Sequence, residues 1–109
     1  MTEEKTTRII HEMVERIARK FNPDKIILFG SYARGTAGLD SDIDLLVVIP
    51  VIGSKRKLAM EIDMAISDRC VPVDLIVIRP EEIDRFMHMV GSITAPAIRE
   101  GVVLYERAA

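Results

Sequence analysis

The sequence predicts a small α/β domain of the α+β kind, in which helices cover a small mixed β-sheet. Three observations predict it. Amphipathic helical stretches alternate with short apolar runs, the chain has only 109 residues, and about a dozen residues join the first two expected strands. That connection is short for a crossover between parallel neighbours, so we expect strands of both directions. At this length, residues 1–109 are expected to form a single domain without a second core.

The elements follow from periodicity and turn chemistry. Apolar residues recur at helical spacing over 3–21, and Pro23 ends that helix because it cannot continue one. A strand over 25–29 leads through Gly30-Ser31 into one helical turn, and a second strand covers 42–49. Next come a helix over 54–69, capped by Ser54, and a strand over 71–78. A further helix begins at Pro80, a short helix over 94–100 is stopped by Gly101, and a last strand covers 102–105.

Composition excludes several classes of function. The net charge is −2 with both signs interspersed, which argues against general nucleic-acid binding. One cysteine, Cys70, cannot form an internal disulfide, and the charged N-terminus lacks a signal-peptide stretch, so a cytoplasmic protein is expected. No apolar run reaches the length of a membrane span. The apolar fraction of 49% predicts an exposed apolar patch for a partner, unless the core absorbs it.

Three aspartates carry the strongest chemical signal. Asp42 and Asp44 open the run DSDIDLLVVIP and project from the same strand face, because strand side chains alternate. Asp74 lies inside a second apolar run, VPVDLIVI. If the two strands pair, three carboxylates converge and repel one another, and Mg²⁺ would relieve that repulsion. The alternatives are a solvated loop pair at 42 and 44, and an edge-strand acid at 74 that faces water.

The turn before these acids can hold phosphate. Gly30 allows close backbone approach, and the Ser31 hydroxyl can donate to a phosphate oxygen at the start of a helical turn. Arg34 follows one turn later and can clamp a triphosphate, or it can be a surface arginine paired with Asp40 or Glu61. Ser41 can cap or hydrogen-bond the aspartate pair.

Together these residues resemble the nucleotidyltransferase superfamily that includes DNA polymerase β. The family pattern of Gly-Ser, a helical turn, Ser-Asp-x-Asp and a later strand Asp reads here as GSYARG at 30–35, SDID at 41–44 and VDL at 73–75. Within the superfamily, residues 1–109 look like a single minimal nucleotidyltransferase (MNT) domain, as in MntA-like antitoxins of HEPN/MNT pairs.

The resemblance implies a specific activity. Asp42, Asp44 and Asp74 would hold two Mg²⁺ ions; Gly30, Ser31, Arg34 and Ser41 would bind ATP; and AMP would pass to a tyrosine hydroxyl of a HEPN-domain toxin. Two alternatives stay open. The chain could neutralise its toxin by binding alone, or it could modify a small molecule of the aminoglycoside type, which would need a homodimer to complete the acceptor pocket.

Overall fold

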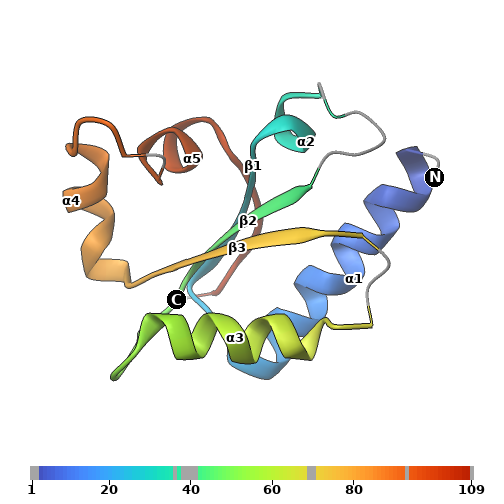
Figure 1. The fold of residues 1–109 in the computed structure, drawn as a ribbon, viewed down its shortest axis with the longest axis horizontal. Coiled ribbons are helices and arrows are strands. Elements are labelled where there is room, and N and C mark those ends of the chain that lie inside the picture. Colours follow the sequence, from blue (N-terminus) through green and yellow to red (C-terminus); the bar gives the residue numbers. More distant parts are fainter. Residues whose placement is uncertain (1–2, 36, 38–41, 69–70, 93, 109) are drawn as a thin grey trace.

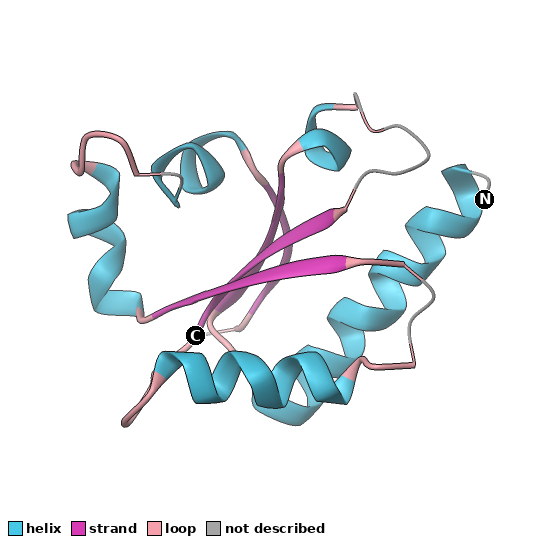
Figure 2. Cartoon of the chain, in the orientation of Figure 1, coloured by secondary structure: helices cyan, strands magenta, loops and turns pink. Residues whose placement is uncertain are grey.

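The computed structural model describes residues 3–35, 37, 42–68, 71–92 and 94–108. Helices and strands alternate much as the sequence predicts (Figure 2). In chain order they are α1 (Glu3–Phe21), β1 (Lys25–Phe29), α2 (Ser31–Arg34), β2 (Ile43–Val48), α3 (Lys55–Ala65), β3 (Val73–Ile78), the 3₁₀ turn η1 (Pro80–Glu82), α4 (Ile83–Met87), α5 (Thr94–Glu100) and β4 (Val102–Glu106).

The four strands form one mixed sheet in the order β3-β2-β1-β4. β1 pairs antiparallel with both β2 and β4, whereas β2 and β3 are parallel. The parallel pair is joined through α3, which supplies the long connection that parallel neighbours need. The mixed sheet that the short first connection predicts is therefore confirmed.

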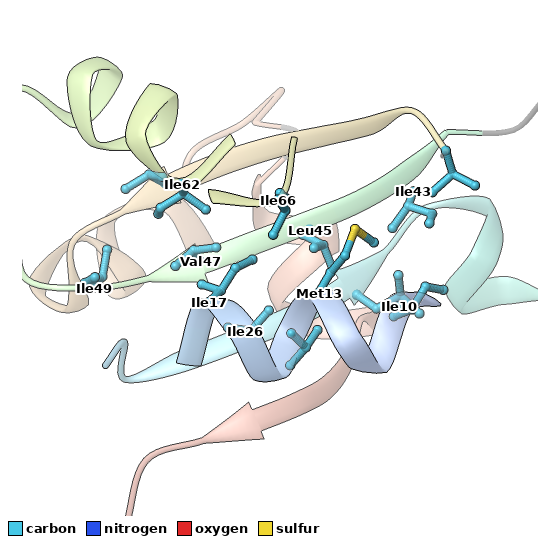
Figure 3. Packing of buried hydrophobic residues seen from close by; sticks show 14 residues of the cluster. Ile10, Met13, Ile17, Ile26, Ile43, Leu45, Val47, Ile49, Ile62 and Ile66 are labelled. Atoms are coloured by element: carbon cyan, nitrogen blue, oxygen red, sulfur yellow. The ribbon is translucent and has the colours of Figure 1, made fainter. Parts of the chain in front are cut away.

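Helices lie on both faces of the sheet (Figure 1). α1 and α3 cover one face, where they bury the larger apolar cluster with the odd-numbered residues of β2 (Figure 3). α4 and α5 cover the other face over a smaller cluster that contains Leu46, Val48 and Ile78. Each fully buried aliphatic side chain contributes about 1.5–3 kcal/mol to folding, so most of the stabilisation comes from the first face.

Several element ends differ from the sequence prediction. β2 and β3 begin at Ile43 and Val73 rather than at residues 42 and 71, and two helices differ more clearly. The expected cap of α3 is confirmed, because the Ser54 side chain accepts from the Lys57 amide at 3.1 Å. The helix nevertheless ends at Ala65 rather than near residue 69, where Arg16 of α1 donates to the Ala65 carbonyl at 3.3 Å. The other difference is the helix expected from Pro80, which begins as a 3₁₀ turn.

Gly101 follows α5 for a different reason than the one expected. It is not one of the described glycines with positive φ, so it does not end the helix in the left-handed conformation. A Cβ at this position would instead overlap the Ala97 carbonyl oxygen and lie 2.9 Å from that of Leu28. The glycine is therefore needed for the close approach of α5 to β1.

Several large apolar side chains are exposed. They lie on α3, on the loops after β2 and α4, and on β4: Met60, Met64, Ile52, Met89, Val90, Val102 and Val103. None of the described helices combines the length and the apolar character needed to cross a membrane.

Candidate functional site

Asp44 and Asp74 lie side by side on neighbouring parallel strands. The register pairs Asp44 of β2 with Asp74 of β3, and on the other side it pairs Asp44 with Phe29 of β1. Strand alternation puts both carboxylates on the face that carries Leu46 and Ile76, which the smaller apolar cluster covers. The two acids are thus the same-face neighbours of Leu46 and Ile76 along β2 and β3, at the edge of the smaller apolar cluster.

The surroundings of Asp44 disfavour its charge. Burial raises the pKa of the Asp44 carboxyl, and the nearby charges of Asp74 and Asp42 and a hydrogen bond with the Asp74 side chain raise it further. The Arg34 guanidinium acts in the opposite direction and lowers that pKa, but its effect is the smallest of those acting on Asp44. The site therefore carries negative charge that its own side chains compensate only in part.

Gly30 lies directly against the Asp44 carboxylate. Its φ is +75°, and a Cβ built on it would overlap Asp44 Oδ2 and lie 3.1 Å from Asp44 Cγ. Any other residue would be strained at this backbone angle and would also displace the carboxylate. The glycine of the Gly-Ser turn therefore lets the backbone approach the Asp44 carboxylate closely.

The turn beyond Gly30 is a single helical turn, α2. The Arg34 amide donates to the Gly30 carbonyl at 3.1 Å, and Gly35 in the left-handed conformation closes the turn with its amide on the Ser31 carbonyl. Ser31 is half-buried at the start of this turn, whereas Arg34 is exposed at its end. A hydroxyl and a guanidinium are thus carried by one short, well-defined element beside the acids.

A hollow of about 240 Å³ lies between α2 and α5 and shares Gly30 and Arg34 with the turn. Phe29, Ala33, Pro96 and Ala97 supply apolar lining, and Glu100 adds a carboxylate. Local sequence pattern does not identify this hollow or Glu100, because α5 approaches α2 only in the folded chain and Glu100 resembles an ordinary solvated helix acid. The small residues of the Ala-Pro-Ala segment in α5 are a weak local signal that a ligand-sized group could approach there.

The structure describes the surroundings of two other predicted site residues, Asp42 and Ser41, less fully than those of Asp44 and Asp74. Asp42 immediately precedes β2 and is exposed, and its charge acts on Asp44. Ser41 lies outside the described residues, as does Asp40, one of the alternative partners of Arg34.

The donor set fits a hard divalent cation. Within the described ranges, no three His, Cys, Asp or Glu side chains gather closely enough to form a ready-made metal centre. Mg²⁺ does not need one, because it commonly takes one or two carboxylates and completes its shell with water and phosphate oxygens. A pair of contacting carboxylates with excess negative charge meets that requirement.

Comparison with known proteins gives a family match. Residues 10–96 match the family model described as "Nucleotidyltransferase domain". A curated Methanocaldococcus jannaschii relative named "Putative protein adenylyltransferase MJ1305" is 45% identical over 58 residues, which are 51% of this chain and 40% of that protein. A second relative from that organism, "Putative protein adenylyltransferase MJ0141", is 45% identical over 38 residues, or 32% of this chain and 38% of its own length. The matches thus span less than half of either relative.

Solved structures share the fold. A "putative nucleotidyltransferase" from Sulfolobus solfataricus is 28% identical, with a TM-score of 0.58 over 92% of this chain and 79% of its own. A structure described as "the toxin-antitoxin with AMP-PNP" is 22% identical, with a TM-score of 0.56 over 89% of this chain and 73% of that chain. The mixed sheet and its helical layers are therefore an architecture in which nucleotidyltransferases occur.

Proposed function

The chain belongs to the nucleotidyltransferase domain family, and from this premise we propose that it transfers AMP from ATP to a tyrosine hydroxyl of a HEPN-type toxin. The observation that carries the proposal is the contact of Asp44 with Asp74 beside Gly30, because two incompletely compensated carboxylates at a Gly-Ser turn suit a magnesium-bound triphosphate. Similarity to relatives named as protein adenylyltransferases supports a protein acceptor.

The proposed reaction exchanges the phosphoanhydride bond between the α- and β-phosphates of ATP for a phosphate ester of the acceptor hydroxyl. The acceptor oxygen bonds to the α-phosphorus, the bond from that phosphorus to the β-phosphate bridging oxygen breaks, and pyrophosphate leaves. Asp74 is exposed on the edge strand β3, from which a protein hydroxyl can approach, and its carboxylate receives the hydroxyl proton. Magnesium, held by Asp42, Asp44 and Asp74, would supply neutralisation of the triphosphate charge and activation of the attacking oxygen.

The other residues of the site bind and orient the nucleotide. The half-buried Ser31 donates its hydroxyl to a terminal phosphate oxygen, and Arg34 offsets charge that builds up on the leaving pyrophosphate. The hollow between α2 and α5 accepts the nucleoside against its apolar lining, with Glu100 available to accept a hydrogen bond from a base amine or a ribose hydroxyl. Glu100→Gln should therefore raise the KM for ATP more than it lowers kcat.

A labelling experiment tests the proposal. The purified chain is incubated with Mg²⁺, ATP labelled at the α-phosphate and a purified HEPN-domain toxin. We expect label on that partner, and we expect Asp44→Asn to reduce the rate by about two orders of magnitude or more. Asp84→Asn, which removes an exposed acid on α4, is the matched control and should label at the wild-type rate. Persistent labelling by Asp44→Asn would contradict the assigned role.

A second candidate is an antitoxin that acts by covering its partner. Its support is the exposed apolar surface, which includes Ile52 and Val90, both fully exposed. The fold shared with a toxin–antitoxin structure makes this candidate worth testing. In a growth-rescue assay, equal protection by wild type and by an Asp42→Ala, Asp44→Ala variant would favour occlusion over catalysis.

A further inference from the structure

The outer side of α3 carries an apolar row that no described part of the chain covers. Met60 and Met64 lie one helical turn apart and expose 62% and 73% of their surface, whereas Ile62 on the inner side is fully buried. The two methionines line an open hollow of about 320 Å³ together with Ala59 and with Leu75 of the edge strand β3. Methionine side chains adapt readily to an opposing surface, so this row suits an interface.

Two opposite charges flank the row in a definite order. Arg56 lines the hollow on the N-terminal side of Met60, and Asp63 lines it on the C-terminal side. Both lie on the same stripe of the helix as Met60, because seven residues make nearly two turns. At a rise of 1.5 Å per residue they are about 10.5 Å apart along the axis, with Met60 near the midpoint.

From this order we propose that α3 is a self-association surface, which binds α3 of a second copy of the chain in antiparallel orientation. A two-fold axis beside Met60 brings Arg56 of one copy opposite Asp63 of the other, twice. The Met60 and Met64 side chains of each copy then fill the hollow of the other. Parallel apposition would place Arg56 against Arg56 and Asp63 against Asp63, so the charges select the antiparallel arrangement.

The proposed surface lies away from the acids. α3 packs on the sheet face that holds the larger apolar cluster (Figure 1). Strand alternation puts Asp44 and Asp74 on the opposite face, with Leu46 and Ile76. Association through α3 would therefore leave the aspartate pair open to nucleotide and acceptor. Self-association does not depend on the proposed function, and failure of one leaves the other standing.

A charge-exchange experiment tests the pairing. Sedimentation or light scattering over a concentration series should give the wild type a mass near twice the 12.2 kDa of the chain. Arg56→Glu and Asp63→Arg should each be monomers, because each homodimer would contain two like-charge contacts. An equimolar mixture of the two variants should recover the dimer mass. In that heterodimer the two introduced charges are opposite in sign and face each other, and the unchanged Asp63 of one variant faces the unchanged Arg56 of the other.

The controls separate misfolding from loss of contact. Ile52→Lys changes a fully exposed apolar residue outside the hollow and should remain dimeric. Met60→Glu should be monomeric with an unchanged circular dichroism spectrum, which covers the case in which Asp63→Arg fails to fold. A wild type that stays monomeric throughout, or single variants that stay dimeric, would overturn the proposal. A mixture that stays monomeric, or an α3 surface that binds only the toxin, would overturn it as well.

Discussion

Gly30 shows how closely the candidate site is built at the level of single residues. Its positive φ turns the chain out of β1, and its missing Cβ leaves the space that the Asp44 carboxylate occupies. Gly35, five residues later, has almost the same φ of +74°, but no atom of the described residues lies within 4 Å of its Cβ position. The two glycines therefore differ in crowding by the acid and also in backbone conformation, since Gly30 has a ψ of −153° and Gly35 a ψ of 17°.

We predict that Gly30→Ala will impair function far more than Gly35→Ala. Gly35→Ala should lose about 1–2 kcal/mol of stability, because alanine is strained in the left-handed conformation of Gly35. Gly30→Ala should lose more, because its φ of 75° and ψ of −153° lie in a region that essentially only glycine adopts. Only Gly30→Ala should also displace the Asp44 carboxylate and reduce nucleotidyl transfer by at least an order of magnitude. Urea unfolding and α-phosphate labelling measure the two effects. Equal labelling by both variants would show that Asp44 tolerates the extra methyl group.

The sequence predicts the identity of these residues better than their contacts. The spacing of Gly30, Asp44 and Asp74 suggests the site because each residue type is unusual in its local run. The in-register pairing of Asp44 with Asp74 depends on how β3 docks beside β2, which only the folded chain determines. Glu100 carries no local signal at all, because its position beside Arg34 comes from the packing of α5 against the sheet.

At the scale of elements, Glu82 connects three segments that the sequence leaves separate. Its carboxylate accepts from the Arg79 amide at 2.8 Å and from Lys55 Nζ at 3.0 and 2.9 Å. Arg79 in turn donates to the carbonyls of Val51 and Gly53, at 3.1 and 2.9 Å. One buried acid thus joins η1, the start of α3 and the loop between β2 and α3.

We predict that Glu82→Gln will destabilise the fold by about 1–3 kcal/mol at neutral pH, since it removes a buried charge that ionic hydrogen bonds satisfy. The Arg79 amide first, and then the Lys55 ammonium, lower the pKa of the Glu82 carboxyl. A carboxyl with a depressed pKa stabilises the folded state above its ordinary pKa and loses this effect as pH falls through the folded-state value.

The difference between wild type and Glu82→Gln should therefore shrink in acid. Urea unfolding across the range from neutral pH to below about pH 4 measures it. Glu81→Gln changes the exposed neighbour and is the matched control, which should cost little at any pH. A Glu82 effect that stays constant with pH would mean that the ionic contacts contribute nothing.

The end of α3 marks a limit of prediction from local pattern. Helical spacing continues past Ala65, which is why the sequence predicts a helix to about residue 69. In the fold, Arg16 donates to the Ala65 carbonyl and pairs with Asp68, and the Ile66 and Ser67 amides turn back onto Asp63 and Met64. A side chain from α1 therefore helps to end the helix, and no local rule contains that contact.

At the scale of the whole molecule, the two faces of the sheet serve different purposes. The face under α1 and α3 holds most of the core (Figure 3), while the face under α4 and α5 holds the smaller apolar cluster (Figure 1). The row of β2 that begins with Asp44 continues into the fully buried Leu46 and Val48, so the acids stand at the border of the smaller core. The stability of the whole chain is therefore linked to the charge at the site.

We predict that the stability order of wild type and Asp44→Asn will reverse when magnesium is added. Because burial and the neighbouring acids raise the pKa of Asp44, the folded state disfavours its ionised form, and wild type loses stability as pH rises through that pKa. Asparagine avoids this loss, so in EDTA at neutral pH Asp44→Asn should melt a few degrees above wild type, and the gap should close in acid.

Adding Mg²⁺ should raise the melting temperature of wild type but not that of Asp44→Asn, because a ligand stabilises only the folded state that binds it. Differential scanning calorimetry with and without EDTA measures both changes. Asp84→Asn should follow wild type in each condition, since it removes an exposed charge from α4. If Asp44→Asn melts below wild type in EDTA, Asp44 stabilises the fold without a cation. In that case the negative charge of the acids does not explain why the site would bind Mg²⁺.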